Sequence, residues 1–111
     1  MWVMTTRGFY SVVEDREDAR FLLVRARVRS DLDHLRELLP DLRPWHDPAA
    51  DYAWRARVER REWAFALGMM AGEIHYPNFK NAVAEQQGRE RSRVYGHVWS
   101  VLLDLQRRRG G

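Results

Sequence analysis

Two segments of the chain, residues 21–28 and residues 52–58, carry an apolar residue at every second position, with arginines between the later ones. The apolar positions are Leu22, Val24, Ala26 and Val28 in the first segment and Tyr52, Trp54, Ala56 and Val58 in the second. The residues between them include Arg25, Arg27, Arg55 and Arg57. A period of two is typical of a strand with one buried face. We expect the apolar set to face the core, because a slip of one residue would bury four charges.

The N-terminal residues predict further strand structure. Residues 2–6 and 9–14 are rich in aromatic and β-branched residues and flank Arg7-Gly8. They form either two short strands or one strand bent at Gly8. The charged run at residues 14–18 is expected to be a solvated turn. Residues 41–50, with Pro44, Trp45 and Pro48, are expected to form a loop.

Helical periodicity takes over between and after the strands. The first expected helix covers residues 31–39, with Ser30 as N-cap, Asp33 in the reciprocal capping position and Pro40 as the stop. The second covers residues 59–74, with Trp63, Leu67, Met70 and Ile74 on its buried face. A third starts at Pro77 and ends near Gly88, and a fourth covers residues 89–106. The fourth carries two adjacent apolar stripes, Val94, Val98, Val101 and Leu105 beside Tyr95, Trp99 and Leu102.

These elements predict an α+β fold: a small three- to four-stranded, mainly antiparallel sheet packed by helices, with a helical C-terminal half. The length of 111 residues fits a single domain, expected over residues 1–106, followed by a basic flexible tail at residues 107–111. The segments Arg25–Val28 and Arg55–Val58 both read Arg-Ala-Arg-Val, and each precedes a helix. This repetition indicates either two strand–helix units in one sheet or a chance match in an Arg-rich chain.

Composition narrows the class of protein. The chain has no Cys, which excludes disulfides, thiolate nucleophiles and Cys-based metal sites. The N-terminus lacks the pattern of a signal peptide, and no apolar run is long enough to span a bilayer. We therefore expect a cytoplasmic protein that does not bind membranes.

The formal charge of +3 is concentrated at the C-terminus. Residues 1–58 hold ten Arg and ten acidic residues, so their formal charges sum to zero. The three arginines Arg107, Arg108 and Arg109 are equal in number to the net positive charge of the whole chain. A basic isoelectric point is therefore weak evidence for a nucleic-acid partner.

A set of short motifs occurs in order along nearly the whole chain. They are the sequences at residues 8–13, 24–28, 51–55, 76–80, 87–88 and 98–106, which read GFYSVV, VRARV, DYAWR, YPNFK, QG and VWSVLLDLQ. As a set they resemble a family of small uncharacterised bacterial proteins. The resemblance implies a bacterial or phage origin and a stand-alone domain, and it carries no activity, ligand or functional residue.

The four arginines of the alternating segments are the main candidate binding residues. If both strands share a sheet, Arg25, Arg27, Arg55 and Arg57 can project from one face and bind phosphates, with Phe9 or Tyr10 stacking on a base. Alternatively, their stems cover apolar surface and their guanidinium groups pair with Glu14 or neighbouring acids. Phe21 and Leu23 share this face. We therefore expect a helix to cover part of it.

Lys80 is a further candidate, within a polar and aromatic cluster at residues 75–80. A helix start there could present backbone N–H groups to an anion near Lys80. Capping and packing explain the same residues, with Phe79 in the core.

No catalytic or cofactor motif is recognisable. The four His are scattered without metal-ligand spacing, and no Ser lies in a nucleophile elbow. Phosphate-binding glycine motifs are absent, so no cofactor is expected.

Two functions remain open, and the sequence does not decide the oligomeric state. The first is a non-enzymatic protein-interaction or regulatory module, favoured by aromatic residues expected at the surface, Trp2 and Trp45. The second is RNA or single-stranded DNA binding through the arginine face and the basic tail. An enzyme is the least expected.

Overall fold

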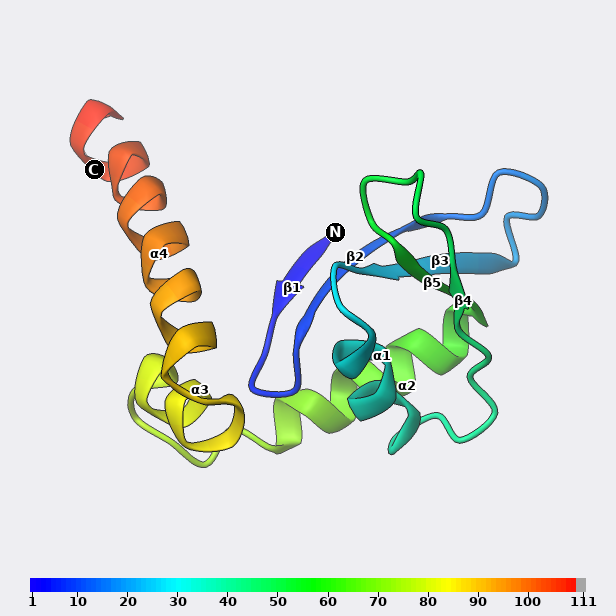
Figure 1. The fold of residues 1–111 in the computed structure, drawn as a ribbon, viewed down its shortest axis with the longest axis horizontal. Coiled ribbons are helices and arrows are strands. Elements are labelled where there is room, and N and C mark those ends of the chain that lie inside the picture. Colours follow the sequence, from blue (N-terminus) through cyan, green and yellow to red (C-terminus); the bar gives the residue numbers. More distant parts are fainter. Residues whose placement is uncertain (110–111) are drawn as a thin grey trace. The chain divides into compact units, whose positions relative to one another are not determined.

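A computed structural model describes residues 1–109, which form two compact units that divide between His75 and Tyr76 (Figure 1). The first, Met1–His75, is called the sheet unit. The second begins at Tyr76 and is called the helical unit. Its last helix continues through Arg109, so the basic residues 107–109 extend a helix. The rest of the predicted tail, residues 110–111, lies outside the described residues.

Over residues 1–109 the strands form one antiparallel sheet in the order β1-β2-β3-β5-β4. The strands are β1 (Trp2–Met4), β2 (Phe9–Glu14), β3 (Phe21–Ala26), β4 (Trp45–His46) and β5 (Trp54–Glu59). The predicted α+β class and the helical C-terminal half are confirmed. The fifth strand, β4, lies where we expected a loop. A strand of two residues is too short to give a detectable alternation in the sequence. It forms because the tertiary fold brings Trp45 and His46 next to β5.

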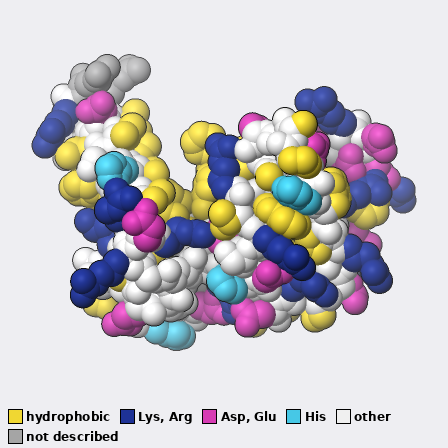
Figure 2. Space-filling model, in the orientation of Figure 1, with side chains coloured by type: hydrophobic (Ala, Val, Ile, Leu, Met, Phe, Trp, Pro, Cys, Tyr) yellow, Lys and Arg dark blue, Asp and Glu magenta, His cyan; other side chains and the backbone are white. Residues whose placement is uncertain are grey.

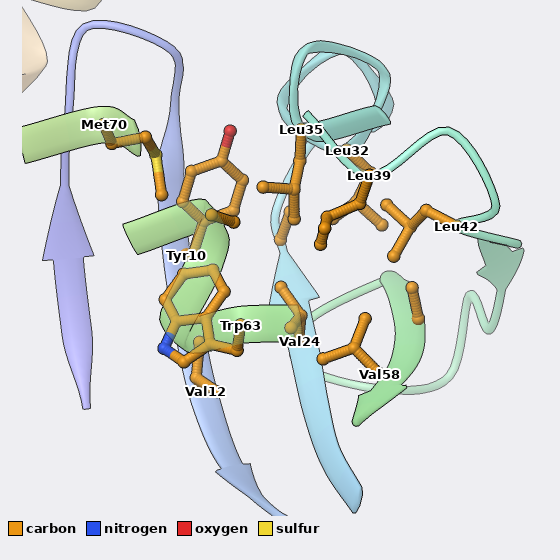
Figure 3. Packing of buried hydrophobic residues seen from close by; sticks show 13 residues of the cluster. Tyr10, Val12, Val24, Leu32, Leu35, Leu39, Leu42, Val58, Trp63 and Met70 are labelled. Atoms are coloured by element: carbon orange, nitrogen blue, oxygen red, sulfur yellow. The ribbon is translucent and has the colours of Figure 1, made fainter. Parts of the chain in front are cut away.

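The core lies on the face of the sheet that α1 (Arg29–Arg36) and α2 (Arg60–Gly72) cover. Figure 3 shows Val24 and Val58 from the sheet meeting Leu32, Leu35 and Trp63 from the helices. The alternation therefore sets the two faces of β3 and β5 as predicted, because Val24, Ala26, Ala56 and Val58 are all buried. Trp54 is partly buried and packs against this cluster. Tyr52, which we expected on the same face, precedes β5 and lies against Arg25 and Arg27 on the other face. Val28, however, is exposed, since β3 ends at Ala26 and the chain has already left the sheet.

Helix α1 begins at Arg29, two residues before its predicted start at Asp31. Val28 occupies the N-cap position without a side-chain hydrogen bond, so the prediction of Ser30 as N-cap was wrong. Asp31 is buried and bonds across to the β1–β2 turn instead. Its carboxylate accepts a hydrogen bond from the Phe9 backbone N–H at 3.0 Å. Its backbone carbonyl accepts one from the Tyr10 hydroxyl at 2.8 Å. The hairpin and α1 are therefore joined by buried hydrogen bonds.

Helix α2 opens with a capping box formed by Glu59 and Glu62. Trp63 and Met70 are buried as predicted, with Ala66 between them. Ile74 is exposed, contrary to the prediction, because α2 ends at Gly72 and Ile74 lies beyond its last turn.

The helical unit is a pair of helices, α3 (Phe79–Gln87) and α4 (Arg89–Arg109). Asn78 is the N-cap of α3 and accepts a hydrogen bond from the Asn81 backbone N–H at 3.0 Å, so Pro77 precedes the helix and does not open it. Gly88 separates the helices with a φ of 95°, which suits glycine. Phe79 and Tyr95 stack with ring centres 5.7 Å apart. No described helix is long and apolar enough to cross a membrane.

Candidate binding site on the open face of the sheet

One row of side chains crosses the entire sheet on the face opposite the core. The register pairs Trp2 with Ser11, Ser11 with Arg25, Arg25 with Arg55, and Arg55 with Trp45. Directly opposed residues of antiparallel strands point to the same side of a sheet. Two arginines therefore lie side by side at the centre of the row, with a tryptophan on each edge strand.

This face carries a hollow of about 500 Å³. Its floor includes Leu23, Arg25 and Arg55 from the central strands, and Trp45 lines it from β4. The loop after β2 contributes further residues, and Asp47 follows β4. Neither α1 nor α2 covers this face, since both pack on the core side. The helix that we expected to cover part of this face is therefore neither α1 nor α2. The alternation in β3 and β5 separates two faces of the sheet, but it does not predict which of them the helices cover.

Arg25 and Arg55 differ in how their charges are satisfied. The Arg25 guanidinium donates to the Ser11 hydroxyl at 2.7 Å and lies 4.8 Å from the centre of the Tyr52 ring. Arg55 is half-buried, and within residues 1–109 its guanidinium has no acidic or hydrogen-bonding partner. Two like charges directly opposite each other in a sheet are destabilising. An anion placed between them would relieve that repulsion.

The other two predicted arginines are already engaged. Arg57 pairs with Asp15 at 2.5 Å, and its guanidinium lies 3.9 Å from the Phe21 ring centre. Arg27 donates to the Asp51 carbonyl at 2.6 Å and stacks 4.0 Å from the centre of the Tyr52 ring. The alternative interpretation, in which arginine stems cover apolar surface and pair with acids, therefore describes Arg57. Arg27 matches it in part, because it stacks on Tyr52 but donates to a backbone carbonyl and not to a carboxylate. The interpretation does not describe Arg55.

Acidic side chains balance the arginines around the hollow. Its lining contains Arg16, Arg25, Arg55 and Arg57 together with Glu14, Asp15, Glu17 and Asp47. Four positive and four negative groups give no net charge. Beside the hollow, hydrogen bonds from Arg20 lower the pKa of Asp18 to about 2, so this acid is ionised at neutral pH. The surface is therefore a mixed-charge site and not a uniformly basic one.

Of the two aromatic residues proposed for stacking on a base, Phe9 lies on this face and Tyr10 does not. Tyr10 is fully buried on the core side, so the prediction that it could stack was wrong. Phe9 lies against Trp2 and Tyr52, with ring centres 6.2 and 6.3 Å away. Trp45, which we expected at the surface, is exposed and lines the hollow. The sequence offered no signal that Trp45 would lie beside Arg55.

Lys80 belongs to the helical unit and lies outside this hollow. Its ammonium nitrogen is 5.1 Å from the centre of the Trp99 ring, one helix away. A cation over an indole face is a packing interaction in its own right. Within the described residues, no three acidic or His side chains are grouped as a metal site would require.

Comparisons with protein-family models, with curated proteins and with solved structures found no significant match to this chain. The function must therefore be inferred from the residues themselves.

Proposed function

We propose that this protein is a non-enzymatic protein-interaction module whose sheet hollow receives a carboxylate group of its partner. The carboxylate belongs to an acidic side chain or to the C-terminus of the partner chain. The observation that carries the proposal is the juxtaposition of Arg55, which lacks an acidic partner, with Arg25 in a hollow beside an exposed tryptophan.

The chemistry of the central pair suits a carboxylate. A guanidinium offers paired N–H donors in a plane, which match the two oxygens of a carboxylate. Ser11 holds Arg25 from one side, so part of the site is already oriented before binding. Trp45, Leu23 and Val13 line the same hollow and provide apolar area for the rest of a peptide. Tryptophan and arginine together are the residues most enriched at energetic centres of protein interfaces.

The charge balance favours a protein over a nucleic acid. A nucleic-acid strand brings one phosphate per nucleotide and is bound by grooves of continuous positive charge. Here the acids from residues 14–17 and Asp47 would face the phosphates on either side of the arginine pair. A protein segment with one acidic group and neutral or basic neighbours avoids that repulsion. RNA or single-stranded DNA binding is accordingly the competing outcome of the test.

The test is a two-dimensional NMR titration of the ¹⁵N-labelled protein with three probes. They are a hexapeptide with one central Glu, the same peptide with Gln, both with an acetylated N-terminus and an amidated C-terminus so that Glu supplies the one carboxylate, and a uridine decanucleotide. A single carboxylate held by two guanidinium groups corresponds to a dissociation constant of the order of 1 mM. We expect the Glu peptide to shift the resonances of residues 11, 25, 45 and 55, including the Trp45 indole, and the Gln peptide to leave them unchanged.

Matched variants locate the binding. Arg55→Gln should abolish the shifts. Arg43→Gln, which removes another exposed arginine without an acidic partner among residues 1–109, should preserve them. Equal responses to the Glu and Gln peptides would contradict the proposal, as would Glu-peptide shifts that persist in Arg55→Gln. Tighter binding of the oligonucleotide, weakened steeply by salt and by Arg55→Gln, would put the nucleic-acid function in its place.

A further inference from the structure

Helix α4 carries an apolar seam formed by Val94, Val98, Val101 and Leu105. The intervals of four, three and four residues are those of a helix that packs along another helix. Val94, Val101 and Leu105 are 47%, 67% and 64% exposed, and Leu102 beside them is 52% exposed. Figure 2 shows apolar side chains gathered along this helix. The seam therefore presents a continuous apolar surface.

The short helix α3 does not cover this seam. It meets α4 through the stack of Phe79 on Tyr95 and through the Ser92 hydroxyl, which donates to the Lys80 carbonyl at 2.9 Å. These two contacts involve the first part of α4, and the contact of Lys80 with the Trp99 ring lies at its middle. At 1.5 Å per residue, α3 with nine residues is about 14 Å long and α4 with 21 residues about 32 Å. The second half of α4 therefore extends past α3.

The helical unit is too small to be stable with the core it has. Its buried hydrophobic residues among those described are Ala82, Val83 and Tyr95. Chains below about 40 residues need a disulfide, a metal or association with another surface to stay folded. Cysteine is absent from the chain, and no metal cluster occurs in the described part. Burial of the seam against another surface would supply the apolar area that this unit lacks.

We infer that a second copy of this chain covers the seam, with the two α4 helices packed against each other. Between Arg93 and Arg107 the single charged residue is Asp104, so the centre of the seam can meet its own copy without strong repulsion. Five large apolar side chains of α4 are each about half exposed or more, namely Val94, Trp99, Val101, Leu102 and Leu105. On two copies they supply apolar area of the order of 1,000 Å². This is about what a specific interface requires. The seam is independent of the sheet hollow, so this inference does not rest on the proposed function.

The salt dependence of association distinguishes a dimer formed through α4 from a complex with an acidic partner. Helix α4 holds six Arg and two acids, with the arginines at its two ends. In a pair of copies these ends repel each other, and salt screens that repulsion. The dimer should therefore strengthen as NaCl rises from 0.05 to 0.5 M, whereas binding of an acidic partner would weaken.

The experiment is sedimentation equilibrium of the full chain over a wide concentration range. We expect a mass that rises from monomer to dimer, with a dissociation constant in the micromolar range, and at least tenfold weaker association for Val101→Asp and for Leu105→Asp. Phe65→Asp, which changes a similarly exposed residue on α2, should leave the dimer intact. Circular dichroism of each variant checks that its helices remain.

Three results would overturn the inference. A wild-type chain that stays monomeric at 0.5 mM shows that the seam is covered within the chain or by another protein. A dimer unaffected by both Asp variants is formed elsewhere. A dimer that Phe65→Asp also dissociates shows that α4 docks on α2 and not on its own copy.

Discussion

The sheet unit and the helical unit solve the problem of burying apolar surface in different ways. The sheet unit closes a core between one face of the sheet and two helices, with Tyr10, Val24, Leu32 and Leu35 essentially inaccessible to solvent. The helical unit buries three hydrophobic residues among those described and leaves a seam open along its longer helix. The difference shows that amphipathic helices are not sufficient for a core. A sheet supplies a broad surface on which helices can pack, and a pair of helices alone does not.

The largest expected effect tests the core of the sheet unit at Trp63. Its ring is almost fully buried and lies edge-on to Tyr10, with ring centres 6.1 Å apart (Figure 3). Trp63→Ala should destabilise this unit by about 3–5 kcal/mol because it leaves a large cavity. Chemical denaturation measures the loss. Trp63→Phe should lose less, since the indole N–H has no hydrogen-bond partner to forfeit. An unchanged midpoint for Trp63→Ala would mean that α2 does not close this core.

The second prediction concerns the hairpin turn at Gly8. A Cβ at this position would lie 2.5 Å from the Asp31 carboxyl carbon, and Asp31 is buried. Gly8→Ala should therefore cost about 1–3 kcal/mol through overpacking. Gly68→Ala in α2 is the control, because a Cβ there meets nothing within 4 Å. It should be neutral or stabilising by about 0.5–1 kcal/mol. Equal stability of the two variants would show that Asp31 moves aside without cost.

The third prediction uses the ion pair that joins the hairpin turn to the end of α2. Arg7 donates to both oxygens of Glu73, at 2.8 and 2.5 Å, and this lowers the pKa of Glu73 from its ordinary value of 4.5. A lowered pKa stabilises the fold above pH 4.5, and this stability is lost as the pH falls through the folded value. Glu73→Gln should cost about 1 kcal/mol at pH 7, discounted for partial exposure. The gap to wild type should close below pH 4.5, and a constant gap would contradict the assignment.

The smallest expected effect comes from removing residues 76–111. If the sheet unit folds without the helical unit, residues 1–75 should keep their core. Amide hydrogen exchange at Val24 and Ala56 should then be as slow in the truncated chain as in the full chain. Loss of that protection would show that the helical unit supplies part of the stability. The comparison between the units would then fail.

Hydrophobic periodicity predicts the buried side chains well where one face of a helix or strand contacts the core along its whole length. The alternation in β3 and β5 predicted the buried side chains of both strands, and the spacing of Leu32 and Leu35 predicted the buried face of α1. The helix ends at Arg36, however, before the predicted end at Leu39 and the stop at Pro40. The errors lie at element ends. Val28 and Ile74 continue their patterns in the sequence but fall beyond the last residue of the strand or helix. Ser30 is a residue type that favours the N-cap position, but the helix already begins at Arg29, so Ser30 lies within it.

In the candidate site, too, the sequence predicted some features and the tertiary structure decided others. The sequence singled out Arg25, Arg27, Arg55 and Arg57 because charge recurs at every second position, a property of the chain itself. Which of these arginines keeps a free guanidinium depends on partners from distant segments. Asp15 pairs with Arg57, the Tyr52 ring lies against Arg27, and in the described part of the chain no acidic side chain pairs with Arg55. Such pairings depend on strand register and loop path, and residue spacing along the chain does not encode them.

By itself, the sequence determined the α+β class, the positions of the main strands and helices, and the two faces of the central strands, because hydrophobic periodicity reflects burial element by element. The tertiary structure alone decided three further features. It brought Trp45 beside Arg55 through a two-residue edge strand, it left the arginine face uncovered by α1 and α2, and it left the seam of α4 exposed. Each depends on which surfaces meet, and that choice is made by the packing of whole elements against one another and not by any local pattern.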